Sequence, residues 1–210
     1  WIVFLDSDDW WTVDKLEVCF NCINDKVDFI YHDLEIRSNK SRIFRRKKNK
    51  SFQLKKPVLI DLLIRGNAIS NSSVIVRKNL LDKVGRINES KNLIASEDYN
   101  AWMKIAKLTE KFIYLPRTLG YYFIHSGGMS NKDMSLSQRR AAEEFLSILN
   151  KQQKLKLEAR IRYTSGRFHY LNFNFKKAKE DLLFVLKKGI FTLKVRSLLM
   201  IINIFMKKNY

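Results

Sequence analysis

The chain has 210 residues, of which 46% are hydrophobic and 12% aromatic, with only two Pro and seven Gly. This composition excludes a disordered or fibrous protein and predicts one folded domain with a sizeable core plus a smaller addition. Lys and Arg number 40 against 21 Asp and Glu, a net charge of +19. Such an excess favours a polyanionic partner, which is a nucleic acid, an anionic membrane surface or a phosphorylated substrate.

The charge is unevenly distributed along the chain. Residues 1–36 contain nine Asp or Glu and two Lys, whereas residues 37–210 are strongly basic. The acidic side chains are therefore concentrated in one segment, where a cation could be held.

The chain begins with an apolar segment, residues 1–5, which predicts a short buried strand. No initiator Met or signal peptide precedes it, and we expect that a first part of the protein is missing. No run in the sequence reaches the ~18 consecutive apolar residues that a membrane span needs.

Polar residues 6–9 follow this strand and predict a turn that caps a helix over residues 10–24. The expected buried face of this helix consists of Val13, Leu16, Phe20 and Ile23. Residues 28–36 alternate between apolar and polar and predict a second strand. Residues 37–56 contain ten basic and no acidic residues and predict an exposed loop or hairpin.

The middle of the chain alternates between helical and strand patterns, which predicts an α/β fold with a mixed sheet flanked by helices. Helices are expected over residues 59–64, 78–84 and 98–108. Strands are expected over residues 73–77, 112–115 and 120–124, the last two on either side of a turn at Pro116.

From residue 137 onward the pattern is helical throughout, so we expect one domain over residues 1–135 and a small all-α extension over residues 136–210. Residues 190–206 are apolar nearly all round, with basic residues at both ends. Two interpretations remain open for this segment: it packs against the preceding helical hairpin, or it lies in a membrane interface.

The most informative tripeptide is Asp6-Ser7-Asp8, directly after the first predicted strand. Alternate side chains can point to the same side, so two carboxylates would converge on one site. Carboxylate oxygens suit Mg²⁺ or Mn²⁺ bridging a diphosphate. The competing interpretation is that these residues only cap the next helix. An EF-hand is disfavoured because Trp11 occupies the position of its obligatory Gly.

Two further elements could carry chemistry. Glu97 and Asp98 open a predicted helix, where they either cap its first turn or provide a general base for an acceptor hydroxyl. His125 precedes the Gly-rich segment 126–130, and its imidazole is either an ordinary exposed side chain or a ligand of metal or phosphate.

Cys19 and Cys22 form a C-x-x-C pair, which alone could be a redox pair or half of a zinc site. No further Cys exists and the His residues are scattered, so we expect two reduced cysteines on a helix of a cytosolic protein. His32 and His169 are expected to be structural.

The order of these motifs resembles the family 2 glycosyltransferases, which have the GT-A fold. The resemblance covers about residues 1–130 and rests on the order of several elements. They are the apolar strand followed by Asp6-Ser7-Asp8-Asp9-Trp10, residues 73–77, Val84-Gly85, the pair Glu97-Asp98 with Trp102, and Tyr121-Tyr122 with His125. It implies a partial GT-A-like domain without its first, nucleotide-binding part. Phe123 stands where the family often has an Arg.

The resemblance implies an enzyme that transfers a sugar from a nucleotide sugar, UDP-linked, to an acceptor hydroxyl with inversion. Asp8 would be the main metal ligand, assisted by His125, and Asp6 would assist at the metal or contact the ribose or a metal-bound water. Asp6, Asp8 and Asp9 would form the donor-binding turn around Mg²⁺ or Mn²⁺. Asp98, with Glu97 beside it, would supply the base. The acceptor would be a glycan or lipid-linked molecule of bacterial cell-surface polysaccharide or lipopolysaccharide synthesis.

A cytoplasmic protein with peripheral contact to the inner face of the cell membrane fits the basic excess. The first alternative is a nucleic-acid-binding module, suggested by Arg45-Arg46-Lys47-Lys48 with Phe44 and Phe52 nearby. The acidic first segment argues against nucleic acid as the partner. The second alternative is an inactive scaffold, which would follow if the expected first part does not exist.

Overall fold

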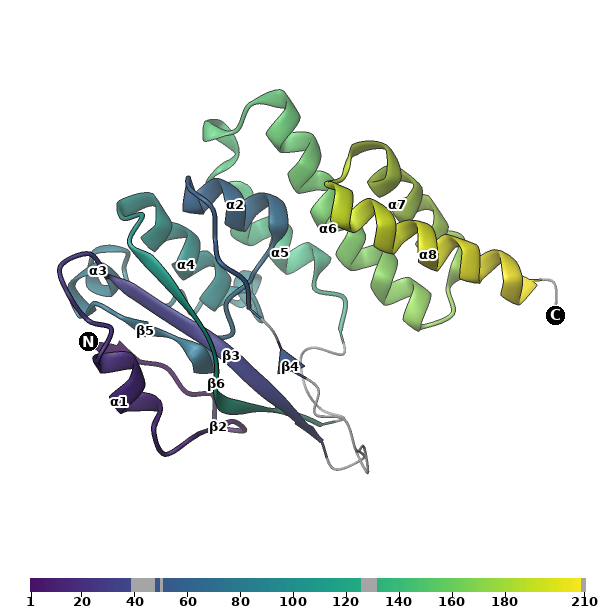
Figure 1. Cartoon of the computed structure of the whole chain (residues 1–210). Helices are drawn as coiled ribbons and strands as arrows, with labels where there is room; N and C mark the ends of the chain where they lie inside the picture. Colours follow the sequence, from purple (N-terminus) through teal and green to yellow (C-terminus); the bar gives the residue numbers. More distant parts are fainter. Residues whose placement is uncertain (39–47, 50, 126–131, 209–210) are drawn as a thin grey trace. The chain divides into compact units, whose positions relative to one another are not determined.

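The computed structural model describes residues 1–38, 48–49, 51–125 and 132–208. These residues form an α/β structure, with strands and helices alternating up to Ile124 and helices alone after it (Figure 1). The chain divides into two compact units. The first comprises residues 1–62, 67–88 and 98–128, and the second comprises residues 63–66, 89–97 and 129–210.

Within the described residues, six strands of the first unit form one mixed sheet in the order β1-β5-β3-β6-β2, with β4 paired to β3. The strands are β1 (Ile2–Val3), β2 (Trp10–Trp11), β3 (Phe29–Ser38), β4 (Lys48–Asn49), β5 (Ile75–Val76) and β6 (Phe112–Ile124). The two long strands β3 and β6 are parallel and every other pair is antiparallel.

Helices cover both faces of this sheet. Successive side chains of a strand point to opposite faces, so neighbouring residues of β3 contact different helices. On β3, Phe29 packs edge-on against Trp102 of α4 (Glu97–Leu108), with ring centroids 5.0 Å apart. Its neighbour Ile30 lies in a separate cluster with Cys19 of α1 (Lys15–Phe20). The predicted strand over residues 28–36 and the predicted helix over residues 98–108 are thus confirmed.

The prediction for the first helix is wrong at its start and on its buried face. Trp10 and Trp11 are strand residues paired with Tyr121 and Gly120 of β6, so the helix begins only at Lys15. The helix buries Lys15 and Cys19. Three of the four side chains expected inside are exposed, namely Val13, Leu16 and Phe20.

The two strands expected around Pro116 are one continuous strand, β6. The register with β3 jumps from His32 opposite Leu115 to Asp33 opposite Thr118, so Pro116 and Arg117 fall in the irregularity. A proline lacks an N–H and is tolerated at such a bulge. The remaining helices of the first part are α2 (Val58–Arg65) and α3 (Lys78–Lys83).

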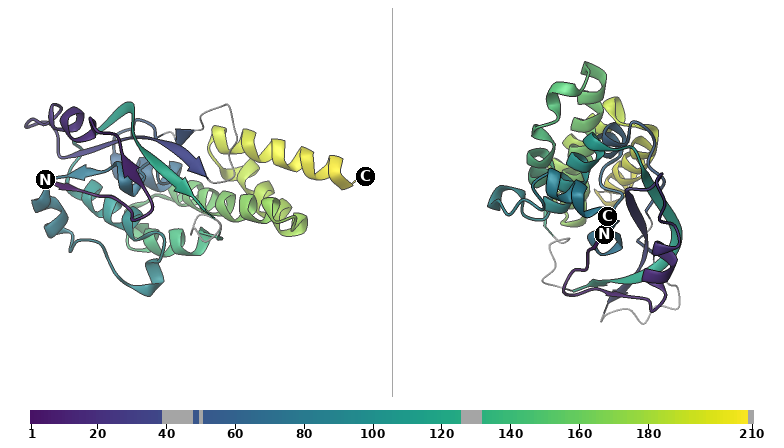
Figure 2. Two further views of the ribbon diagram at one scale, coloured as in Figure 1. Left: turned by 90° about the horizontal axis from the view of Figure 1, so that it is seen from below. Right: turned by 90° about the vertical axis from the view of Figure 1, so that its left-hand side faces the viewer.

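The second unit contains a run of helices, α5 (Ser135–Glu143), α6 (Lys151–Leu171), α7 (Phe175–Lys188) and α8 (Phe191–Lys208). Figure 2 shows α6, α7 and α8 lying side by side. Their shared core consists of Tyr163, Ala178, Leu182, Val185, Leu193, Ile201 and Ile204. None of the helices in the described part of the chain is long and apolar enough to cross a membrane.

Candidate active site

The first acidic residue after β1 is held by a short 3₁₀ helix, η1 (Asn71–Ser73). The backbone N–H of Asp6 donates to Oγ of Ser72 at 3.0 Å, and Nδ2 of Asn71 donates to Oδ1 of Asp6 at 2.6 Å. The backbone N–H of Asp9 donates to the carbonyl oxygen of Asp6 at 3.1 Å, which closes the turn. The carboxylate of Asp6 is therefore fixed in direction by its neighbours.

Asp9 connects this turn to the end of β6. Its side chain is buried, and Oδ1 accepts a hydrogen bond of 2.9 Å from the backbone N–H of Phe123. Burial raises the pKa of the Asp9 carboxyl, against the lowering effect of Ser72 and of that backbone bond. Asp9 thus ties residues 6–9 to β6, the strand that His125 directly follows.

Asp8 and His125 meet at the mouth of this turn. Oδ2 of Asp8 and Nε2 of His125 lie 3.1 Å apart, although the residues are 117 positions apart in the sequence. Their side chains are 43% and 41% exposed, so both remain open to solvent and to a ligand. The ring of Phe123 stacks on the imidazole with centroids 6.0 Å apart, which orients it. Two residues expected to share one site are thus together.

The buried Lys15 binds the 3₁₀ helix η1, which holds Asp6. Nζ of Lys15 donates to the carbonyl oxygen of Ser72 at 2.8 Å, and Nε1 of Trp11 donates to the same oxygen at 3.1 Å. The ammonium group lies 3.9 Å from the centroid of the Trp11 ring. Burial lowers the pKa of Lys15 to about 7. The sequence did not predict a role for Lys15, Asn71 or Ser72 at this site. Only the polar run 70–73, which contains Asn71 and Ser72, has a pattern typical of a turn.

Glu97 and Asp98 open α4. Oδ1 of Asp98 accepts a hydrogen bond of 2.6 Å from the backbone N–H of Tyr99, and the carboxyl is partly exposed. Trp102 follows one turn later, and its ring contacts Phe4 with centroids 5.3 Å apart. Residues four positions apart share one helix face, so Asp98 lies on the same face of α4 as Trp102, whose ring contacts Phe4. A meeting of Asp98 with Asp8 stays a prediction.

Oε2 of Glu97 is buried and makes no hydrogen bond with any residue of the described ranges. Glu97 belongs to the second unit and Asp98 to the first, so the pair lies where the two units join in sequence. The role of Glu97 beside the base stays a prediction.

Buried polar side chains of β3 form hydrogen bonds around His32, which the sequence predicted to be structural. Oδ1 of Asp33 accepts hydrogen bonds from the hydroxyl of Tyr114 at 2.8 Å and from the backbone N–H of Ser51 at 2.9 Å. Burial, with Asp33 nearby, raises the pKa of Tyr114 to about 12. Burial lowers the pKa of His32 to about 4, so its imidazole is neutral at physiological pH.

Oδ2 of Asp8 and Nε2 of His125 contact each other at 3.1 Å, and both are atom types that Mn²⁺ accepts as ligands. Asp6 reaches this turn with one carboxylate oxygen engaged by Asn71. No group of three or more His, Cys, Asp or Glu side chains with metal-binding geometry occurs among the residues that the structure describes. The residues present therefore offer a partial coordination set.

The two cysteines lie outside this site. Cys19 and Cys22 are free, Cys19 is buried, and burial raises the pKa of the Cys19 thiol to about 11. The thiol of Cys19 is therefore protonated at neutral pH, which disfavours attack or metal binding by this residue.

Two sequence expectations fall outside the described residues. One is the Gly-rich segment after His125, residues 126–130. The other is the basic cluster Arg45-Arg46-Lys47-Lys48, of which only the backbone of Lys48 is described.

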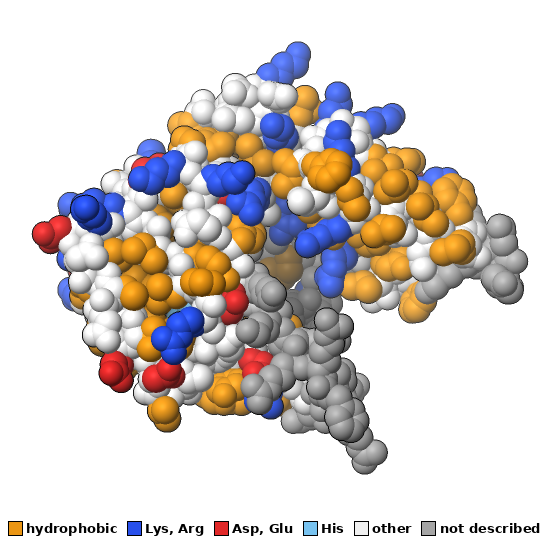
Figure 3. Space-filling model, viewed as in Figure 1, with side chains coloured by type: hydrophobic (Ala, Val, Ile, Leu, Met, Phe, Trp, Pro, Cys, Tyr) orange, Lys and Arg blue, Asp and Glu red, His pale blue; other side chains and the backbone are white. Residues whose placement is uncertain are grey.

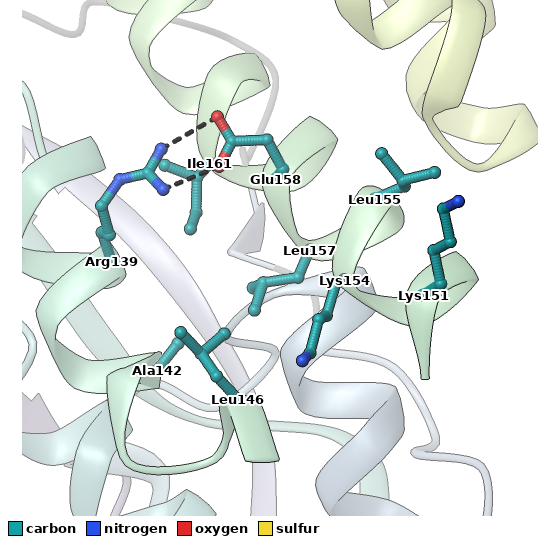
Figure 4. Close-up of a pocket in the computed structure, with 9 residues that line it drawn as sticks. All are labelled: Arg139, Ala142, Leu146, Lys151, Lys154, Leu155, Leu157, Glu158 and Ile161. Atoms are coloured by element: carbon teal, nitrogen blue, oxygen red, sulfur yellow. Dashed lines mark hydrogen bonds and ion pairs between the residues drawn. The ribbon is translucent and has the colours of Figure 1, made fainter. Parts of the chain in front are cut away.

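A cavity of about 550 Å³ lies within the second unit, between α5 and α6 (Figure 4). Arg139 and Glu158 face each other across one side of it and form two hydrogen bonds of 2.7 and 3.0 Å. Lys151 and Lys154 line the other side together with apolar residues. None of the predicted site residues lines this cavity, and its ion pair is already satisfied.

The chain matches no protein-family model and no curated protein sequence.

Proposed function

We propose that this chain is a metal-dependent, inverting glycosyltransferase that resembles family 2 enzymes with the GT-A fold. The observation that carries the proposal is the meeting of Asp8 with His125, 3.1 Å apart, at an acidic turn that follows a strand. The α/β architecture with helices on both sheet faces is compatible with it. The donor would be a UDP-sugar and the acceptor a glycan or lipid-linked hydroxyl compound.

Asp8 and His125 are the residues that would hold Mg²⁺ or Mn²⁺, with Asp6 contributing its oxygen that Asn71 does not bind. The cation would neutralise the charge that grows on the leaving diphosphate. Asp9 would not join this set, because it is buried and its Oδ1 accepts from Phe123. Its task is to hold the turn in place.

Asp98 would act as the general base. During transfer, the acceptor oxygen forms a bond to the anomeric carbon while the bond from that carbon to the diphosphate oxygen breaks. The proton of the acceptor hydroxyl passes to the carboxylate of Asp98, and the electron pair of the broken bond leaves with the diphosphate. Support comes from the contact between Trp102, one turn after Asp98, and Phe4, which lies two residues before Asp6.

The test is sugar transfer, or hydrolysis of UDP-sugars when no acceptor is supplied, by Asp98→Asn. A single general base contributes about 10²–10⁴ in rate, so we expect kcat to fall by about that factor while binding of the UDP-sugar is kept. The matched control is Asp82→Asn, because Asp82 is an exposed carboxylate on α3 with two basic neighbours. Turnover of Asp98→Asn at a rate near that of the control would reject the base assignment.

A further inference from the structure

The last helix, α8, has an unusually apolar outward face. Phe191 is 79% exposed and Leu199 is 63% exposed, although both are large hydrophobic residues. At 100° per residue, the exposed large apolar side chains of α8 fall within one arc of about 120°. We call this set the outer face; it consists of Phe191, Val195, Leu198, Leu199, Ile202, Phe205 and Met206.

The opposite side of α8 is already used for packing. Leu193, Ile201 and Ile204 are buried in the core that α8 shares with α6 and α7. The helix therefore lies along the second unit with one apolar side packed and another apolar side open. The outer face can contact a partner without loss of that core.

The surroundings of the outer face are strongly basic. Residues 175–208 contain nine Lys or Arg and two acidic residues, and α8 itself has no acidic residue. Nζ of Lys179 lies 4.4 Å from the centroid of the Phe205 ring, so a cation from α7 borders the face directly. Figure 3 shows hydrophobic side chains gathered over α7 and α8, with Lys and Arg side chains beside them.

We propose that the outer face of α8 docks on an anionic lipid surface, with the helix lying in the plane of the interface. Apolar side chains would enter the boundary between headgroups and acyl chains, and the bordering Lys and Arg would contact lipid phosphates. This proposal rests on α8 and the neighbouring side chains of α7, and it does not depend on the proposed transferase activity.

Charge argues for lipid over a second copy of the chain. Pairing two outer faces would bring two basic surfaces together, which is electrostatically unfavourable. An anionic bilayer instead complements both parts of the surface, its apolar stripe and its basic border. A groove of about 460 Å³ between α7 and α8, lined by Lys176, Lys179 and Phe205 among others, opens beside the face. Glu180 also lines this groove, so it offers room for a lipid group next to two cations and one carboxylate.

The experiment is flotation of the full chain with vesicles of phosphatidylcholine and phosphatidylglycerol, compared with vesicles of phosphatidylcholine alone. We expect binding to the anionic vesicles that weakens as salt is added. The variant Leu199→Asp/Ile202→Asp places two carboxylates in the outer face and should reduce the bound fraction about tenfold or more. Leu136→Asp, which changes a 55% exposed leucine of α5, is the matched control and should bind like the unaltered chain.

The melting temperatures of both variants show whether they fold, and light scattering reports their oligomeric state. Three results would overturn the proposal. The first is absence of binding by the unaltered, folded chain. The second is an equal loss of binding in Leu136→Asp. The third is a dimer that does not float with vesicles and that becomes a monomer in Leu199→Asp/Ile202→Asp. The last result would assign the outer face to self-association.

Discussion

Lys15 positions the candidate site although it is not one of the residues proposed to bind the cation or the donor. Its buried ammonium group binds the carbonyl oxygen of Ser72, whose hydroxyl in turn accepts from the backbone of Asp6. A buried cation is costly unless it is compensated, and here a hydrogen bond and the Trp11 ring compensate it in part. The depressed pKa of Lys15 is the measurable sign of the remaining cost.

This cost makes the stability of the fold depend on pH. The pKa of Lys15 is about 7 in the folded chain against an ordinary value of 10.5, so between these values the unfolded chain binds the extra proton. The contribution of Lys15 to the free energy of unfolding therefore rises as the pH increases from about 7 to about 10.

The variant Lys15→Met removes this dependence. We expect the difference in free energy of unfolding between the unaltered chain and Lys15→Met to shift by about 1–2 kcal/mol in favour of the unaltered chain between pH ~7 and pH ~9. Urea denaturation at the two pH values measures it. Lys26→Met, which changes an exposed lysine, should show no such shift. A parallel pH profile for Lys15→Met and the unaltered chain would mean that Lys15 titrates normally.

Among the site residues, the sequence predicted those that belong to compact motifs. Asp6 and Asp8 follow an apolar strand, and His125 follows another, so their types and positions indicated a ligand site. Asn71 and Ser72 are common turn residues, and nothing in the sequence shows that they reach Asp6 across more than sixty positions. Lys15 was hidden for a different reason, because a lysine in a helix is ordinarily exposed.

At the scale of elements, local patterns succeeded where an element depends mainly on its own sequence. Strand β3 and helix α4 follow the expected positions closely. The local patterns failed where pairing with a distant segment decides the structure. Trp10 and Trp11 lie inside the segment 10–24 that the sequence predicts to be helical, but pairing with Tyr121 and Gly120 makes them a strand. Such non-local pairing overrides the local preference.

The pairing of β2 with β6 is the element that joins the acidic turn to the strand carrying His125. Gly120 is buried in this pairing, and a Cβ at its position would lie 3.0 Å from the backbone oxygen of Trp10 and 3.0 Å from Leu34. A larger side chain must therefore push β2 away from β6.

We expect Gly120→Val to lower the free energy of unfolding by about 1–3 kcal/mol and to disturb the contact between Asp8 and His125. Urea denaturation measures the first effect, and the chemical shifts of the His125 imidazole report the second. Thr118→Val is the control on the same strand, because the buried Thr118 hydroxyl makes no hydrogen bond within the described ranges. Gly120→Val with the stability of the control and an unchanged His125 spectrum would disprove this role of the pairing.

At the scale of the whole molecule, the acidic segment and the basic, apolar surface belong to different units of the chain. The acidic segment 1–36 belongs to the first unit and contains the turn with Asp8, whereas the second unit contains α8 with its apolar outer face and the basic residues of α7 and α8. A polyanion would be repelled by the acidic turn unless a cation screened it. The distribution of charge is therefore compatible with the proposed cation site in the first unit and with the proposed lipid docking of the second unit.

The most direct measurement of the central claim is Mn²⁺ binding followed by electron paramagnetic resonance. We expect the unaltered chain to bind Mn²⁺ in the presence of UDP, and Asp8→Ala and His125→Ala to weaken this binding about tenfold or more, since each removes one of the proposed ligands. Asp25→Ala, which alters an exposed carboxylate of the same acidic segment, should bind Mn²⁺ like the unaltered chain. Equal Mn²⁺ affinity in Asp8→Ala, His125→Ala and Asp25→Ala would contradict the claim that Asp8 and His125 form a cation site.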